Sequence, residues 1–129
     1  MKLSAQTLPQ INTEKVMVPA NELLRLPEKV LQFGTGMLLR GLPDYFIDKA
    51  NKKGIFNGRI VVIKSTSKGD TLCFDEQNGL YTLCIRGLEN GEKVEENMIN
   101  SSISRVLTAT TEWQQVLYYA HDSNFQILI

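Results

Sequence analysis

The sequence predicts an α/β domain built on a parallel sheet, and three neighbouring segments support that prediction. "KVLQF", residues 29–33, is a short apolar run that ends at a glycine pair. "GRIVVIKS", residues 58–65, holds four consecutive β-branched residues between turn signals, which is typical of a strand buried on both faces. Between them, apolar residues at helical spacing predict a helix over about 42–53. Strand, helix and strand within about 35 residues form a βαβ unit, the building block of a parallel sheet.

The segments on either side of this unit are of different kinds. Residues 1–20 are polar and weakly patterned, and 21–26 could form a short helix before Pro27, so we treat residues 1–27 as an N-terminal extension. Residues 79–106 contain alternating apolar residues around Asn90-Gly91, which predicts a β-hairpin inserted into the domain.

Three elements are expected toward the C-terminus: a strand at 104–107, a helix from Thr110 or Thr111 to Ala120, and a last buried strand at 125–129. The last strand stops at a third consecutive apolar residue, with no polar terminus beyond it. We therefore expect a truncated domain whose sheet edge could promote self-association.

Composition limits the classes of partner and the compartment. The 129 residues suit one soluble domain, and 14 Lys plus Arg balance 14 Asp plus Glu, so we expect neither a nucleic-acid nor a membrane partner. Cys73 and Cys84 form no CxxC pair and are too few for a disulfide scaffold, which favours buried or idle thiols in a cytoplasmic protein. His121 is the single histidine, and we assign neither a metal site nor a catalytic residue.

The glycine pair raises the main functional question. Gly34 and Gly36 directly follow the first strand, where a dinucleotide-binding loop has its first two glycines. The first makes a tight turn, and the second lets the backbone approach a pyrophosphate. Leu39 stands where that pattern has its third glycine. Because two glycines are a weak signal, a purely structural turn is an equal alternative at this point.

Pro43 affects where the following helix can begin. Inside a helix that started at Met37, a proline at this position would cost about 3 kcal/mol, whereas it is well tolerated in a first turn. We therefore expect the main helix to begin near Gly41 or Leu42. Arg40 would then lie in the preceding loop, either solvated or free to turn its guanidinium toward an anion.

The segment after the second predicted strand is polar. It reads Lys64-Ser65-Thr66-Ser67-Lys68-Gly69, with an acidic residue only at Asp70. Proteins of this fold that prefer NAD commonly have an acidic residue earlier, to bind the ribose hydroxyls. Hydroxyls and lysines could instead bind a ribose or a 2′-phosphate, or the segment could be a solvated loop.

Taken together, "VLQFGTGMLLRG", "NGLYTLCIRGLENGE" and "SISRVL" resemble the mannitol dehydrogenase family of polyol dehydrogenases, over residues 28–129. In that family a Rossmann-type domain binds NAD, and a helical C-terminal domain carries the catalytic lysine with Asn and His partners. The resemblance implies that 28–129 is a partial Rossmann-type NAD-binding domain with a β-hairpin insertion. It also implies a reaction in which hydride transfer interconverts a hexuronate and an aldonate, so that NAD(H) and such a sugar acid are the expected partners.

The resemblance also implies a set of cofactor-binding residues. They are Phe33, Gly34, Thr35, Gly36, Met37, Leu38 and Arg40, to which the loop after the second strand adds Lys64 and Ser65. Many family members have an aromatic residue where Leu38 stands. The catalytic lysine has no counterpart in this chain, so the chain alone is expected to be inactive. Two alternatives are a fructuronate or mannitol-type dehydrogenase of the same family and a nucleotide-binding domain without catalysis.

Overall fold

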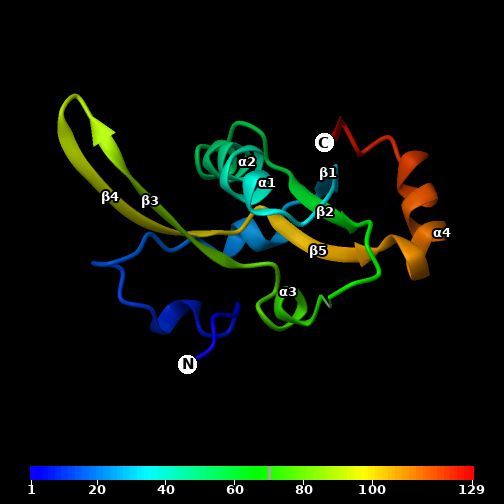
Figure 1. Cartoon of the computed structure of the whole chain (residues 1–129), viewed down its shortest axis with the longest axis horizontal. Coiled ribbons are helices and arrows are strands. Elements are labelled where there is room, and N and C mark those ends of the chain that lie inside the picture. Colours follow the sequence, from blue (N-terminus) through cyan, green and yellow to red (C-terminus); the bar gives the residue numbers. More distant parts are fainter. Residues whose placement is uncertain (70) are drawn as a thin grey trace.

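The computed structural model describes residues 1–69 and 71–129, and its centre is a four-stranded parallel sheet (Figure 1). The strands are β1 (Glu28–Phe33), β2 (Arg59–Lys64), β5 (Ile103–Thr108) and β6 (Ile127–Leu128). They lie side by side in the order β5-β2-β1-β6, and each neighbouring pair is parallel. Numbered within the sheet this order is 3-2-1-4, the arrangement of a doubly wound dinucleotide-binding fold. The predicted Rossmann-type α/β class is confirmed.

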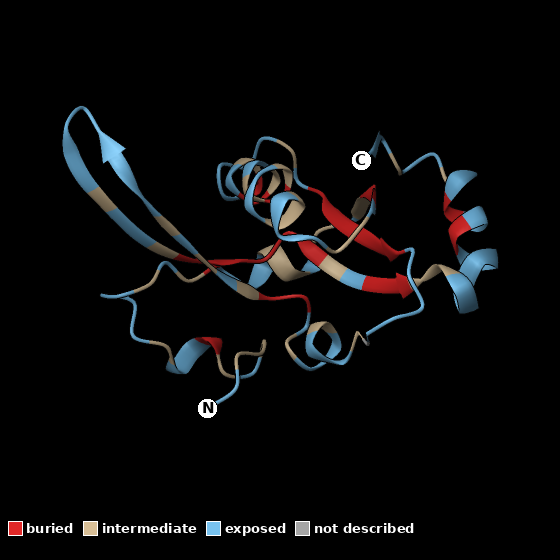
Figure 2. Ribbon diagram, viewed as in Figure 1, coloured by how far each residue is buried: buried red, intermediate tan, exposed pale blue. Residues whose placement is uncertain are grey.

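Strands β1 and β2 form the middle of the sheet and its core. All six residues of β2 are buried, as its continuous apolar run predicts (Figure 2). On one face Leu31 and Val61 pack against α4 (Ala109–Ala120) through Val116 and Tyr119. On the other face a second cluster packs against Ile47 of α2 (Pro43–Lys52). Helices therefore cover both faces, which is the usual arrangement for a parallel sheet.

The connection from β1 to β2 differs from the prediction in one respect. The main helix α2 begins at Pro43, which occupies its first position as expected. The preceding segment is itself a short helix, α1 (Met37–Gly41), so the prediction that Arg40 lies in a loop is wrong. Proline cannot continue a helix from α1, because its ring clashes with the carbonyl four residues earlier. The chain therefore breaks at Leu42, with φ −122° and ψ −82°, and starts a second helix.

The predicted hairpin consists of β3 (Tyr81–Glu89) and β4 (Glu92–Asn100), which pair antiparallel. Asn90 and Gly91 both have positive φ, as the two-residue turn requires. The hairpin is inserted between α3 (Leu72–Glu76), a helix that the sequence patterns do not predict, and β5. Its outer part extends away from the sheet as an arm (Figure 1).

Residues 1–27 pack along the base of this arm. They contain two short 3-10 helices, η1 (Leu8–Gln10) and η2 (Asn21–Arg25). Leu8 is buried in a cluster with Leu80 and Ile99, and Met17 pairs with Met98 of β4.

The prediction that the last strand is buried is wrong. Ile127 and Leu128 of β6 are 39% and 72% exposed, because β6 pairs only with β1 and lies at the edge of the described sheet. Cys73 and Cys84 are free and exposed, so of the two alternatives for the cysteines, buried or idle thiols, the structure excludes burial. Among the described residues, no helix combines the length and the apolar character needed to cross a bilayer.

Candidate dinucleotide site

The glycine loop lies at the carboxyl end of β1, where the strand order reverses between β1 and β6. In open α/β sheets, ligands bind outside the carboxyl ends of the strands at such a reversal. Gly34 has φ +129°, a conformation that side chains disfavour, and its N–H donates to Ile63 O at 2.9 Å. An added Cβ would also lie 2.9 Å from Leu39 Cδ1. Gly34 is therefore required by the turn itself.

Gly36 differs from Gly34 because the fold does not need a glycine there. Its φ of −67° and ψ of 159° are accessible to other residues, and an added Cβ would meet no heavy atom within 4 Å. The loop is thus open at Gly36, immediately before α1, whose first N–H groups have no acceptor within the helix. The side chains of Phe33, Met37 and Leu38 around it are 45%, 82% and 75% exposed.

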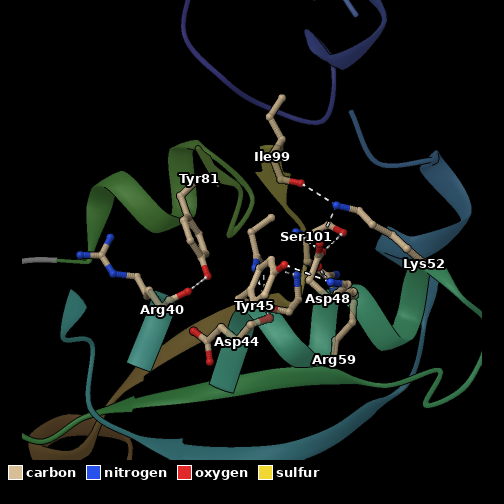
Figure 3. A network of polar contacts seen from close by, with 12 residues as sticks. Arg40, Asp44, Tyr45, Asp48, Lys52, Arg59, Tyr81, Ile99 and Ser101 are labelled. Atoms are coloured by element: carbon tan, nitrogen blue, oxygen red, sulfur yellow. Dashed lines mark hydrogen bonds and ion pairs between the residues drawn. The ribbon is translucent and has the colours of Figure 1, made fainter. Parts of the chain in front are cut away.

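Arg40 lies on α1 with its guanidinium between two aromatic rings. Its guanidinium carbon is 5.8 Å from the ring centroids of both Phe74 and Tyr81. The Tyr81 hydroxyl donates to the Arg40 carbonyl at 2.8 Å (Figure 3). Both side chains line a cavity of about 210 Å³ beside α1, together with Met37 and Gly41. Arg40 Nε is buried and has no hydrogen-bond partner among the described residues.

The face of α2 that meets the sheet carries two buried carboxylates beside the apolar Ile47. Asp44 and Asp48 are fully buried, whereas the apolar Leu42 and Phe46 are 51% and 57% exposed. Asp48 accepts hydrogen bonds from Ser101 N and Oγ at 2.8 and 2.9 Å. Figure 3 shows this cluster, in which Lys52 also forms an ion pair with Asp48.

Asp44 lies nearer to the glycine loop and is connected to it by Gln32 of β1. Gln32 Nε2 is 3.4 Å from Asp44 Oδ2 and 3.3 Å from Gly34 O. Burial raises the pKa of Asp44 to about 7, although the Gln32 hydrogen bond and the Arg40 charge lower it in part. Sequence analysis missed both residues. The one sequence feature that could have indicated this connection is Gln32, a polar residue inside the apolar run before the glycines.

The loop after β2 also reaches this edge of the sheet. Lys64 is buried, and its Nζ donates to Thr66 O at 2.8 Å. Its ammonium group is therefore hydrogen-bonded to the backbone of the loop that follows β2. Ser65 is exposed beside it. The structure therefore brings Lys64 and Ser65 near the glycine loop but leaves only Ser65 uncommitted, and Asp70 lies outside the described residues.

One other region offers less for binding. A cavity of about 400 Å³ lies at the amino ends of the strands and is lined by Arg59 and Arg105. Arg59 donates to the carbonyls of Leu24, Ser101 and Ile103, and Arg105 to Glu28, so both guanidinium groups are already bound. The described part of the chain contains no group of three or more His, Cys, Asp or Glu residues able to hold a metal ion.

Solved structures establish the class of fold. Mannitol 2-dehydrogenase of Pseudomonas fluorescens, solved as a ternary complex with NAD and D-mannitol, superposes with a TM-score of 0.83 at 23% identity. A D-sorbitol dehydrogenase superposes with a TM-score of 0.81 at 18% identity. Each superposition covers 99% of this chain and 26% of the other. The fold is that of a domain shared by these polyol dehydrogenases.

Sequence comparison is more specific. The altronate oxidoreductase of Halalkalibacterium halodurans is 43% identical over 105 residues, which are 81% of this chain and 20% of that enzyme. The Bacillus subtilis enzyme of the same name is 38% identical over 103 residues, 80% of this chain and 22% of its own length. No protein-family model matches the sequence. The predicted resemblance is confirmed: the chain has homologues named altronate oxidoreductase, and it spans about a fifth of their length.

Proposed function

We propose that this chain is the NAD-binding part of an oxidoreductase that interconverts D-tagaturonate and D-altronate by hydride transfer. The observation that supports it best is the open glycine at position 36, at the point where the strand order reverses. The fold supplies a reason for Gly34 but none for Gly36, and a backbone that must approach a pyrophosphate supplies one. The similarity to altronate oxidoreductases supports the choice of reaction.

In this proposal the loop residues bind and orient the cofactor. The backbone N–H groups at the start of α1 face the pyrophosphate, with Gly36 allowing close approach. The resemblance implies that side chains of the loop also contact the cofactor. These are the apolar Phe33, Met37 and Leu38 and the polar Thr35. When bound, NAD(H) supplies or accepts the hydride.

The other assigned groups approach from neighbouring elements. Arg40 reaches the same edge from α1 and adds positive charge beside the anionic ligand. Ser65 is free to contact the ribose, whereas Lys64 donates to Thr66 O, which favours NAD over a cofactor with a 2′-phosphate. We assign no catalytic residue to this chain, because hydride transfer also requires the substrate carbonyl beside a proton donor.

The sequence comparison supports a sugar-acid substrate over the mannitol-type alternative. Identity reaches 43% with an altronate oxidoreductase, against 18–23% with the structures of the mannitol and sorbitol dehydrogenases. We also propose a cytoplasmic location, where two free exposed cysteines remain reduced.

The test of cofactor binding is an NMR titration of the ¹⁵N-labelled chain with NADH at millimolar concentration. Weak binding is expected, and the amide signals of Gly34, Gly36 and Met37 should shift while those of the arm stay unchanged. Inorganic pyrophosphate serves as the matched anion control and should shift the same loop signals by less. Shifts that fall instead on the cavity around Arg59, or no shift anywhere, would overturn the proposal.

A further inference from the structure

The amide of Gln32 connects the glycine loop to a carboxylate that sequence reasoning does not associate with it. A side-chain amide has two N–H donors on one nitrogen, and Gln32 Nε2 directs them at Gly34 O and Asp44 Oδ2. Gln32 and Asp44 are both fully buried, so the bond between them is shielded from water, and the bond to Gly34 O is part-buried. The carbonyl that forms part of the loop turn is therefore connected to α2 through one side chain.

The charge of Asp44 decides how that amide is oriented. A carboxylate only accepts hydrogen bonds, so it requires the NH₂ side of Gln32 to face it. The second N–H of the same group then faces Gly34 O. A neutral group at position 44 can donate as well as accept, which allows the amide to turn and place its oxygen against the Gly34 carbonyl. The loop would then lose a hydrogen bond and gain a repulsion.

We propose that Asp44 is a positioning residue for the glycine loop, holding Gly34 through Gln32 in the arrangement that admits the dinucleotide. This inference rests on the proposed function for its ligand, but the connection between Asp44 and the loop does not. It also gives a reason for a buried carboxylate whose desolvation is only partly offset by hydrogen bonds: Asp44 Oδ1 has no hydrogen-bond partner among the described residues.

The groups around Asp44 make its charge sensitive to pH. Arg40 from α1 favours the ionised form, as does the Gln32 hydrogen bond, whereas burial opposes it. Other titratable groups of this cluster are Tyr81 from β3 and, on the same helix, Asp48 with its ion-pair partner Lys52. Asn100 of β4 donates to the Asp44 carbonyl at 3.1 Å. With the pKa of Asp44 near 7, the loop should be held at higher pH and released as the pH falls.

The first experiment follows the ligand-free protein by ¹⁵N NMR between about pH 5 and pH 9. The side-chain NH₂ signal of Gln32 and the backbone amides of Gly34 and Thr35 should titrate together. Asp44→Asn, nearly identical in shape, should abolish that shared titration. The matched control is Asp48→Asn, which removes an equally buried carboxylate of the same helix that bonds Ser101 rather than the loop. It should leave the titration intact.

The second experiment measures the dissociation constant for NADH. The wild-type value should rise about fivefold as the pH falls through 7, and Asp44→Asn should show the weaker value at every pH. Gln32→Met removes both hydrogen bonds while leaving Asp44 in place. It should weaken NADH binding to a similar extent, and combining it with Asp44→Asn should add nothing further.

The outcomes are distinguishable. If the loop amides of the wild type do not respond to pH, or if Asp44→Asn binds NADH as well as the wild type or better, the positioning role is refuted. If the loop titrates as described but NADH does not bind, the connection between Asp44 and the loop stands and the proposed function fails.

Discussion

Replacing Gly36 by valine should separate ligand binding from folding at the glycine loop. The backbone at this position has φ −67° and ψ 159°, which a branched residue adopts without strain. The added Cβ enters open space, with no heavy atom within 4 Å. The variant should therefore fold normally.

The size of each effect follows from that geometry. Removing a glycine lowers the entropy of the unfolded chain, which stabilises by about 0.4–1 kcal/mol. Valine is a poorer residue than glycine before a helix, which offsets part of that gain. The net change in the free energy of unfolding should stay within about 1 kcal/mol. A pyrophosphate kept off the loop loses at least one charge-assisted hydrogen bond, about 1.5–3 kcal/mol, so NADH affinity should fall at least about tenfold.

The assay pairs thermal unfolding with an NMR titration of NADH. Gly87→Val is the matched control, because Gly87 lies on the arm and also has open space around its Cβ. It should leave NADH binding unchanged and raise the free energy of unfolding by about 0.4–1 kcal/mol, because no helix cap offsets the gain there. Gly34→Ala gives the opposite pattern, losing stability because of its φ of +129°. If Gly36→Val stays folded and binds NADH as tightly as the wild type, the loop is merely a turn and the cofactor assignment is wrong.

Four further predictions concern other parts of the molecule. The chain should bind NADH more tightly than NADPH in parallel titrations, and a clear preference for NADPH would contradict the assignment of Lys64. Asp44 contributes stability that is present below about pH 4 and lost as the pH rises through about 7, because the folded state binds its proton more tightly than the unfolded chain. In denaturant titrations near pH 8, Asp44→Asn should therefore be more stable than the wild type. The gain in the free energy of unfolding is up to about 4 kcal/mol, because the pKa of Asp44 is about 7 in the folded state against 3.8 in the unfolded chain. Equal stability of the two proteins would refute this prediction. Leu128→Lys should reduce self-association in sedimentation velocity, because it charges the exposed edge strand β6; an unchanged profile would exclude that edge. In a spectrophotometric assay the chain alone should not oxidise NADH with tagaturonate, and turnover comparable to that of an altronate oxidoreductase would mean that catalytic residues lie within 1–129.

The predictions for Asp44 and for Gly36 point to different relations between stability and binding. Asp44→Asn should stabilise the fold and weaken the loop, since a buried ionised carboxylate costs stability and orients Gln32. Gly36→Val should weaken binding at nearly constant stability. A role for either residue in folding alone would not produce these combinations.

Local sequence patterns determined much of the scaffold. A continuous run of β-branched residues specified the buried strand β2, and Asn90-Gly91 specified the tight turn of the arm, because each depends on backbone preferences that act over a few residues. Pro43 predicted the start of α2 for the same reason, since its missing N–H and its ring act within one helical turn. The glycine turn after β1 belongs with these features.

The tertiary structure decided the rest, because burial depends on what a segment packs against. In α2, Asp44 and Asp48 are buried while the apolar Leu42 and Phe46 are half exposed. Ser101, which follows β4, supplies the hydrogen bonds that make burial of the Asp48 carboxylate tolerable, whereas the Asp44 carboxylate is bonded by Gln32 of β1. The connection from Gly34 through Gln32 to Asp44 joins a strand and a helix across a turn, and no spacing rule predicts it. The sequence alone identified the two glycines. Only the strand order 3-2-1-4 shows that they lie where the order of strands reverses, beside the edge strand β6. Leu128 of that strand is 94 residues further along the chain than Gly34.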